Sequence, residues 1–223
     1  MPTAAHALII FDCDGVLVDS EPIANPILST FLNNEGYECS STESVKKFVG
    51  KDLPSILRQV ERELGRQLSE GFMERLRTET YTAFKEHLRP IDGIETALGQ
   101  IVTPKCVASS GDVEKVNLTL NLTGLRHHFG DAIFSAHQVA QGKPHPDLFL
   151  HAAHHFGVSP HLCTVVEDSV PGVVGARAAG MTVLGYAGGR YLPPKHDQSL
   201  SEAGAQVFFT MRALPGLLGI KPL

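Results

Sequence analysis

The apolar run Leu8–Phe11 ends abruptly in the acidic turn Asp12-Cys13-Asp14-Gly15. Four apolar residues without alternation, closed by a turn signal, predict a fully buried central strand of a parallel sheet. Ligands of open α/β sheets bind beyond the carboxyl ends of the strands, so Asp12 and Asp14 indicate a candidate site. A plain strand followed by a turn also accounts for Asp and Gly here, because both residue types suit turns.

From Gly93 onward the chain alternates short apolar runs with segments of helical periodicity. This alternation is typical of βα units and predicts an α/β fold with a Rossmann-like core built on a parallel sheet. Further strands are predicted at Cys106–Ser109, Ala132–Phe134, Thr164–Glu167, Thr182–Leu184 and Val207–Phe209. Helices are predicted at 113–122, 146–156 and 170–179, and a polar, proline-bearing loop at 188–199.

The segment between the first strand and Gly93 has a different character. After Ser20 a helix is predicted that ends at Gly36, and from Cys39 to about Leu88 the chain is rich in charged residues and glutamine and has no β-branched run. Two apolar stripes at helical spacing follow, formed by Leu53, Ile56, Leu57, Val60 and Leu64 and by Met73, Leu76, Thr80 and Phe84. We therefore expect a small inserted α-helical cap domain at 19–88 and a core domain at 1–18 and 89–223.

The charge of the chain limits its partners. The 223 residues carry a formal net charge of -5, and the sequence pI is near 6.1. This balance gives no electrostatic reason to expect a nucleic acid or an anionic membrane as partner. No apolar stretch is long enough to cross a bilayer, and no basic segment precedes the first apolar run. We expect a soluble cytoplasmic protein, with a monomer favoured over an oligomer.

The cysteines and histidines show neither a disulfide pattern nor metal-ligand spacing. Cys13, Cys39, Cys106 and Cys163 are dispersed, and three of them fall in or beside apolar runs, where cysteine packs as a small hydrophobic residue. The eleven histidines form no group that fits a metal site. Cys13 lies between the two acids of the opening turn, but packing alone explains a thiol there. We assign these residues no catalytic role.

Three later segments lie at or just after predicted strand ends. Ser109-Ser110-Gly111 offers a hydroxyl and backbone N–H groups to an anion ahead of a helix, although Ser and Gly are also ordinary linkers. Lys143 stands in a proline-bearing loop, where a single lysine is usually a solvated surface charge. Glu167 and Asp168 repeat the opening pattern of a buried strand that ends in acids.

Taken together, these segments predict one phosphoryl-transfer site. Carboxylates from the ends of two strands would repel one another unless a cation lies between them. Oxygen-rich coordination of this kind suits magnesium, which takes one or two carboxylates, waters and a phosphate oxygen. Ser109 and Lys143 would add a hydroxyl and a cation at the same edge of the sheet.

The chain resembles the haloacid dehalogenase superfamily, and within it the phosphatases and mutases that carry a small helical cap after the first motif. The Asp-x-Asp-Gly motif of that family corresponds to Asp12–Gly15. Its strand-terminal Ser or Thr corresponds to Ser109, its lysine to Lys143, and its acidic motif to Glu167-Asp168. The four motifs occur in order over nearly the whole chain.

The resemblance implies the chemistry of the acids. Asp12 is expected to attack phosphorus and form an aspartyl-phosphate, and Asp14 to protonate the leaving oxygen and then deprotonate the attacking water. Asp14 needs a raised pKa for this role, and neighbouring carboxylates push in that direction. The resemblance also implies Mg²⁺ held by the side chains of Asp12 and Asp168 and by the backbone carbonyl of Asp14, with Glu167 in or near its coordination shell.

The resemblance implies the substrate-binding residues as well. Ser109 and Lys143 would stabilise charge on the phosphoryl oxygens. Lys51 follows Gly50 in a loop that corresponds to the substrate loop of the cap, although a charged residue there can equally be solvated. The residues expected to bind substrate are Ser109, Ser110, Gly111, Lys143 and Lys51.

Three functions remain open at this point. Asp14 argues for phosphoryl transfer, because haloacid dehalogenases lack this second aspartate. Ala24 stands where a β-phosphoglucomutase-type mutase would carry histidine, so water is the expected phosphoryl acceptor. The leading hypothesis is a magnesium-dependent phosphatase of a small phosphorylated metabolite, a sugar phosphate or a sugar-acid phosphate such as 6-phosphogluconate. A phosphosugar mutase and a non-catalytic regulator that binds a phosphorylated metabolite are the alternatives.

Overall fold

The computed structural model describes residues 6–48, 51–189 and 192–220. Its core is a six-stranded parallel sheet with the order β3-β2-β1-β4-β5-β6. Every predicted strand is present, and its ends lie within two residues of the prediction. The strands are β1 (Leu8–Phe11), β2 (Lys105–Ser109), β3 (Ile133–Ser135), β4 (Cys163–Glu167), β5 (Thr182–Tyr186) and β6 (Gln206–Phe208).

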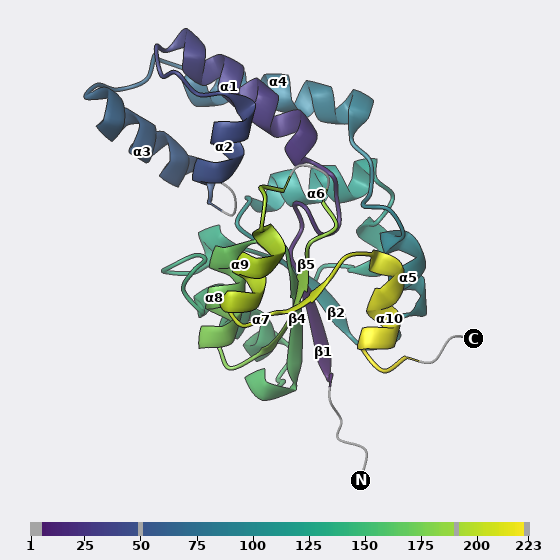
Figure 1. The fold of residues 1–223 in the computed structure, drawn as a ribbon. Helices are drawn as coiled ribbons and strands as arrows, with labels where there is room; N and C mark the ends of the chain where they lie inside the picture. Colours follow the sequence, from purple (N-terminus) through teal and green to yellow (C-terminus); the bar gives the residue numbers. More distant parts are fainter. Residues whose placement is uncertain (1–5, 49–50, 190–191, 221–223) are drawn as a thin grey trace.

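Strand β1 lies in the middle of the sheet, as its uninterrupted apolar run predicts. All four of its side chains are fully buried, and successive residues pack on opposite faces. One face is covered by α5 (Ile94–Gln100), α6 (Val113–Leu122) and α10 (Leu214–Leu217). The other is covered by α7 (Asp147–His155), α8 (Val170–Ala178) and α9 (His196–Glu202), which gives the three layers seen in Figure 1.

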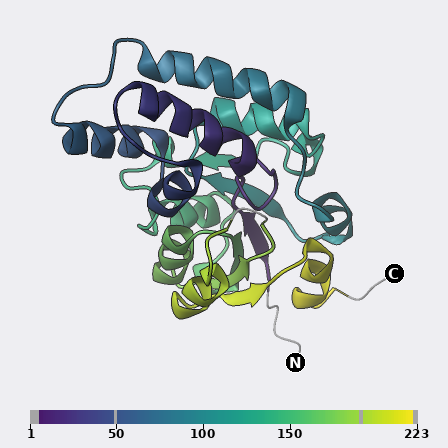
Figure 2. The ribbon, with the colours of Figure 1, turned by 45° about the horizontal axis from the view of Figure 1, so that its top comes forward.

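Four helices between β1 and β2 form the inserted cap. Apolar residues of all four pack into a core of their own, separate from the two cores that flank the sheet. Figures 1 and 2 show these helices beyond the end of the sheet at which the strands finish. The cap helices are α1 (Glu21–Asn34), α2 (Ser41–Phe48), α3 (Leu53–Leu64) and α4 (Phe72–His87).

The two linkers between cap and core pair with each other. Asp19 N donates to Arg89 O at 2.9 Å, and Ile91 N donates to Leu17 O at 3.0 Å. These bonds lie beside the predicted domain boundaries at 18/19 and 88/89, which remain predictions. The paired linkers hold the entry and exit of the cap together above β1.

Two details of the sequence prediction are wrong. Met73 was expected in the apolar stripe of α4 but is 44% exposed, because the helix turns Phe72 into the cap core instead. The segment 188–199 was expected to be a loop throughout, but α9 begins at His196 within it. This helix is polar except for Leu200, whose burial against the sheet anchors it. Among the described helices none is both long and apolar enough to span a membrane.

Candidate active site

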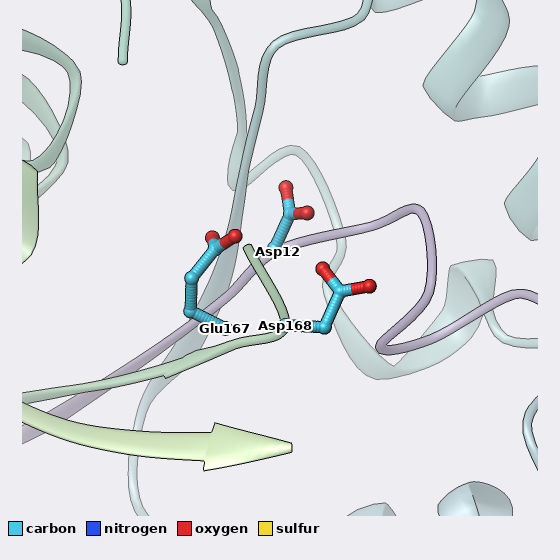
Figure 3. A group of neighbouring side chains, drawn as sticks. All are labelled: Asp12, Glu167 and Asp168. Carbon is cyan, nitrogen blue, oxygen red and sulfur yellow. The ribbon is translucent and has the colours of Figure 1, made fainter. Parts of the chain in front are cut away.

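The acids of the first and fourth predicted motifs meet at the carboxyl end of the sheet. Asp12 follows β1, and its N–H donates to Val166 O at 2.9 Å, which continues the β1–β4 ladder by one residue. Glu167 and Asp168 lie at the end of β4. Carboxylate oxygens of Asp12, Glu167 and Asp168 lie within 4.8 Å of one another, and Figure 3 shows them around one small space. The parallel register thus assembles the acidic group that the sequence predicts.

Lys143 reaches into this acidic group from the loop before α7. Its Nζ lies 2.7 Å from Asp12 Oδ1 and 2.8 Å from Glu167 Oε2. The side chain is 1% exposed, so it is a buried cation and not a solvated surface charge. The neighbouring carboxylates raise its pKa even though burial alone would lower it. Lys143 therefore carries a permanent positive charge between the two acids.

Glu167 is the most enclosed of the acids. It is fully buried, and Oε1 accepts hydrogen bonds from Ser169 N at 3.0 Å and Ser169 Oγ at 2.5 Å. A Cβ atom on Gly172 would lie 2.1 Å from Glu167 Cδ, so glycine at this position leaves the space that the carboxylate fills. With Lys143 on Oε2, both oxygens of Glu167 have partners.

The residues present fit a divalent cation. Burial and the charge of Glu167 raise the pKa of Asp12 to about 7, and the same two causes raise the pKa of Asp168 well above its ordinary value. Such mutual repulsion is relieved when a cation binds between the carboxylates. Gly15 has a φ of +75°, and a Cβ atom there would lie 1.9 Å from Asp168 Oδ2. Glycine at this turn therefore admits the Asp168 carboxylate to the site.

Asp14 is held apart from the other acids by different partners. Its Oδ1 accepts a hydrogen bond from Ser20 Oγ at 2.6 Å, and its Oδ2 pairs with Lys115 Nζ at 2.8 Å. Burial alone would raise the pKa of Asp14, but Lys115 and Ser20 outweigh burial and lower it. The prediction of a raised pKa from neighbouring carboxylates is therefore wrong for this arrangement, since Lys115 was not foreseen.

The predicted phosphate-binding turn lies at the end of β2, beside these acids. Ser109 Oγ accepts a hydrogen bond from Gly111 N at 3.0 Å, and Gly111 O accepts one from Ser135 Oγ at 2.8 Å. The turn leads directly into α6, whose first residues are capped by Asp112. Ser109, Ser110 and Gly111 all line the same cavity as Asp12 and Lys143.

This cavity lies between cap and core and has a volume of about 260 Å³. The core supplies the strand-end acids, Lys143 and the Ser109 turn. The cap supplies an apolar wall that includes Phe48 and Leu76, together with a few polar side chains. A substrate in the cavity would touch both the cap helices and the core. The polar cap residues in the lining are Glu21, Asn25, Lys51, Asp52, Arg77, Thr80 and Tyr81.

Lys51 and Ala24, the two cap residues to which the sequence analysis gave a functional meaning, both line the cavity. Lys51 is exposed and donates to Gln59 Oε1 at 2.9 Å, so its role in substrate binding stays a prediction. Gly50, the other member of that predicted loop, lies outside the described residues. Ala24 presents a methyl group to the cavity at the position where a mutase histidine was considered.

Sequence reasoning missed several residues of the site. Lys115 stands in the first turn of α6, where the helix dipole disfavours a cation, and this unusual placement was the available signal. His137 lines the cavity, although its sequence context predicts no such role. Buried His196 has Nε2 at 2.5 Å from the backbone oxygen of Asp168. Only the fold reveals these last two contacts.

Cys13 keeps the structural role that its sequence context suggested. It is buried, its Sγ lies 3.7 Å from Thr119 Oγ1, and burial and the two flanking acids raise the pKa of its thiol. The protonated thiol is a poor nucleophile. All four cysteines are buried and free.

Comparison with known proteins gives consistent results. Residues 9–186 match the haloacid dehalogenase-like hydrolase family. A 6-phosphogluconate phosphatase of Escherichia coli (strain K12) is 33% identical over 210 residues, which cover 94% of this chain and 93% of that protein.

Two solved structures share the fold. A conserved haloacid dehalogenase-like protein of unknown function from Agrobacterium tumefaciens (strain C58) superposes with a TM-score of 0.83 at 40% identity, covering 96% of this chain and 98% of that chain. A HAD family hydrolase from Deinococcus radiodurans R1, solved with bound phosphate and sodium, has a TM-score of 0.79 at 29% identity and covers 99% of this chain and 100% of that chain.

The family match covers most of the chain, and the similarity to the Escherichia coli protein extends over nearly all of both sequences. The predicted α/β core with an inserted helical cap agrees with the architecture of the solved relatives. The resemblance read from the four motifs is thereby confirmed, and so is the prediction of a hydrolase. This chain belongs to the haloacid dehalogenase-like hydrolase family.

Proposed function

We propose that this protein is a magnesium-dependent phosphatase that hydrolyses a small phosphorylated metabolite through an aspartyl-phosphate. The observation that carries the proposal is the separate anchoring of the two acids that follow β1. Asp12 pairs with Lys143, whereas Asp14 pairs with Lys115. Two neighbouring carboxylates in different environments suit a division of labour between nucleophile and acid/base.

Asp12 is the proposed nucleophile. Lys143 holds one of its oxygens, so the carboxylate has one orientation when substrate arrives. A carboxylate oxygen of Asp12 attacks phosphorus while the bond from phosphorus to the leaving oxygen breaks. Water then attacks the phosphorus of the acyl phosphate, which releases inorganic phosphate and restores the carboxylate.

Asp14 is the proposed acid/base. It gives a proton to the leaving oxygen in the first step and takes one from the attacking water in the second. Its lowered pKa suits the second step. The first step requires the protonated form, and the anionic phosphate that enters beside Asp14 favours that form because like charges disfavour ionisation.

Asp12 and Asp168, with the backbone carbonyl of Asp14, are the proposed ligands of Mg²⁺. When bound, the ion neutralises charge on the transferring phosphoryl group. Both oxygens of Glu167 already accept hydrogen bonds from Lys143 and Ser169, so we place Glu167 beside the metal, where it fixes Lys143. Ser109 and Lys143 are the proposed partners of the phosphoryl oxygens.

The proposed substrates are sugar phosphates and sugar-acid phosphates, with 6-phosphogluconate as the first candidate. The name of the Escherichia coli relative supports this class. Ala24 supports hydrolysis over a mutase reaction, because a methyl group cannot move a proton to or from a second hydroxyl. The size of the cavity under the cap, about 260 Å³, suits a small substrate of this class.

The test is phosphate release from a panel of phosphorylated metabolites and from an aryl phosphate, each with and without Mg²⁺. We expect release that depends on Mg²⁺, with 6-phosphogluconate among the best substrates. Binding of these compounds without phosphate release would instead indicate a regulator. Conversion of β-glucose 1-phosphate to glucose 6-phosphate without net phosphate release would indicate a mutase.

A further inference from the structure

We propose that Lys115 is a positioning residue for the acid/base Asp14, and that Arg77 of the cap controls this positioning through Asp112. The inference rests on the proposed phosphatase function. It assigns a chain of four residues, Arg77–Asp112–Lys115–Asp14, that runs from cap helix α4 to the catalytic acid.

The last link holds the carboxylate of Asp14 at both oxygens. Ser20 Oγ lies 2.6 Å from Oδ1, and Lys115 Nζ lies 2.8 Å from Oδ2. The terminal torsion of an aspartate is otherwise broad, so a partner on each oxygen restricts how the group turns. Proton transfer needs the acid within hydrogen-bond reach of the leaving oxygen, and small misplacements are costly. Loss of Lys115 would free one side of the acid.

The middle link fixes where Lys115 stands. Its backbone N–H donates to Asp112 Oδ1 at 2.8 Å, which is the capping bond of α6. Its stem crosses the phosphate-binding turn, since a Cβ atom on Gly111 would lie 3.3 Å from Lys115 Cδ. A cation in the first turn of a helix opposes the helix dipole. The ion pair with Asp14 offsets that disadvantage, and so accounts for a lysine at this position.

The first link comes from the cap. Arg77 Nη2 lies 3.2 Å from Asp112 Oδ1, the same oxygen that accepts the Lys115 N–H, and 2.9 Å from Glu114 Oε2. The guanidinium also lies over the ring of Tyr81, 5.1 Å from its centroid. Helices α4 and α6 lie side by side (Figure 2), so these contacts join cap to core.

This arrangement couples cap position to the orientation of the acid. When α4 rests on α6, Arg77 holds the Asp112 carboxylate that caps the turn carrying Lys115. When the cap moves away, Asp112 loses its cap partner and the first turn of α6 is held less firmly. The acid is then fully positioned only with the cap over the site, where bulk water is excluded.

The experiment compares kcat/KM for two substrates in Lys115→Ala and Arg77→Ala, because this ratio reports phosphoryl transfer to Asp12 and not the later hydrolysis step that both substrates share. One is 6-phosphogluconate, whose alkoxide leaving group needs a proton, and the other is 4-nitrophenyl phosphate, whose phenolate leaves without one. We expect Lys115→Ala to lower kcat/KM on the first substrate by about 100-fold and on the second by less than about 5-fold. Arg77→Ala should lower the value for 6-phosphogluconate by about 10-fold, again with a smaller loss on 4-nitrophenyl phosphate. Lys115→Arg should restore part of the loss.

Matched variants separate the relay from general effects of charge and fold. Arg75→Ala removes an arginine of the same helix that bonds within the cap, to Glu70 O and Ser69 Oγ, and should stay within about twofold of wild type. Asp112→Asn keeps a good capping residue but removes the charge that Arg77 binds, so it should match Arg77→Ala. The double variant Arg77→Ala/Lys115→Ala should be no slower than Lys115→Ala alone.

Three results would overturn the inference. Equal losses on both substrates in Lys115→Ala would mean that Lys115 is structural or binds the phosphate. Losses that multiply in the double variant would mean that Arg77 acts independently. Rates of Arg77→Ala equal to those of wild type would mean that the cap does not position Asp14 through Asp112 and Lys115. In these cases wild type is still active and the proposed function stands, whereas a wild type that releases no phosphate from any substrate overturns both.

Discussion

The carboxylate of Asp168 lies where a side chain on Gly15 would begin, since a Cβ atom on residue 15 would lie 1.9 Å from Asp168 Oδ2. Gly15→Ala should therefore displace the Asp168 carboxylate and weaken Mg²⁺ binding by about 10-fold or more. Titration calorimetry with Mg²⁺ measures the affinity directly, without reference to turnover.

The control for this prediction is Gly36→Ala. Gly36 has a φ of +79°, close to the +75° of Gly15, but no atom within 4 Å of its Cβ position. Both variants bear the cost of a left-handed alanine, about 1 kcal/mol in the free energy of unfolding. Only Gly15→Ala should lose metal affinity. Equal affinities in the two variants would contradict the placement of Asp168 as a ligand.

Asp12→Asn tests the nucleophile. Asparagine has nearly the same shape but cannot form the acyl phosphate, so kcat should fall by more than about 1,000-fold while the thermal unfolding midpoint stays close to wild type or above it. Acid-quenched wild-type protein should carry phosphate on Asp12 during turnover, and the variant should carry none. A variant that retains full activity would exclude Asp12 as nucleophile.

Lys143→Met tests the buried cation between the acids. The substitution leaves Asp12 and Glu167 facing each other without a positive charge, and breaking such a pair costs about 3–5 kcal/mol of stability in metal-free protein. Urea unfolding measures this loss. Lys51→Met is the matched control, because Lys51 is exposed and its bond to Gln59 lies at the surface, so its effect should stay within about 0.5 kcal/mol.

The raised pKa of Asp12 predicts how stability depends on pH. Between the ordinary value of 3.8 and about 7, the folded protein holds a proton on Asp12 that the unfolded chain has released. The free energy of unfolding of metal-free protein should therefore fall as pH rises through this range, by up to about 1.4 kcal/mol per pH unit from this group. The raised pKa of Asp168 acts in the same direction.

Mg²⁺ should remove much of this slope, because it stabilises the ionised acids. Thermal unfolding of wild type at pH 5 and pH 8, with and without Mg²⁺, checks the sign, with the larger gain from Mg²⁺ at the higher pH. Asp12→Asn lacks the titrating group and should show a shallower slope. Stability of the metal-free wild type that rises over this range would contradict the assigned direction.

The sequence was sufficient for the framework and for the acids of the site. Unbroken apolar runs such as Leu8–Phe11 identify buried parallel strands, and in a parallel sheet their carboxyl ends lie along the same edge. Once Asp12 and Glu167 are placed at two such ends, their proximity follows from the topology. Local patterns of apolar and acidic residues therefore predicted a contact between distant parts of the chain.

The sequence was insufficient where a contact depends on which way a helix faces. Lys115 and Arg77 lie on surface-like stretches of their helices, and only the docking of cap on core turns both toward Asp112. The prediction that Met73 is buried was wrong for a related reason. A shift of one position around α4 places Phe72 in the cap core and leaves Met73 exposed. Periodicity gives the face of a helix to within a residue, and active-site chemistry needs finer placement than that.

The central position of β1 also governs how the protein folds. Its neighbours are β2 and β4, so the strand that precedes Asp12 is made first but is paired on both sides only after the chain has grown past Glu167. The cap between β1 and β2 has its own core and relies on contacts closer in sequence, so it can form earlier. A nascent chain would then display a folded cap before the sheet closes. Chemistry therefore waits until the last central strand is in place.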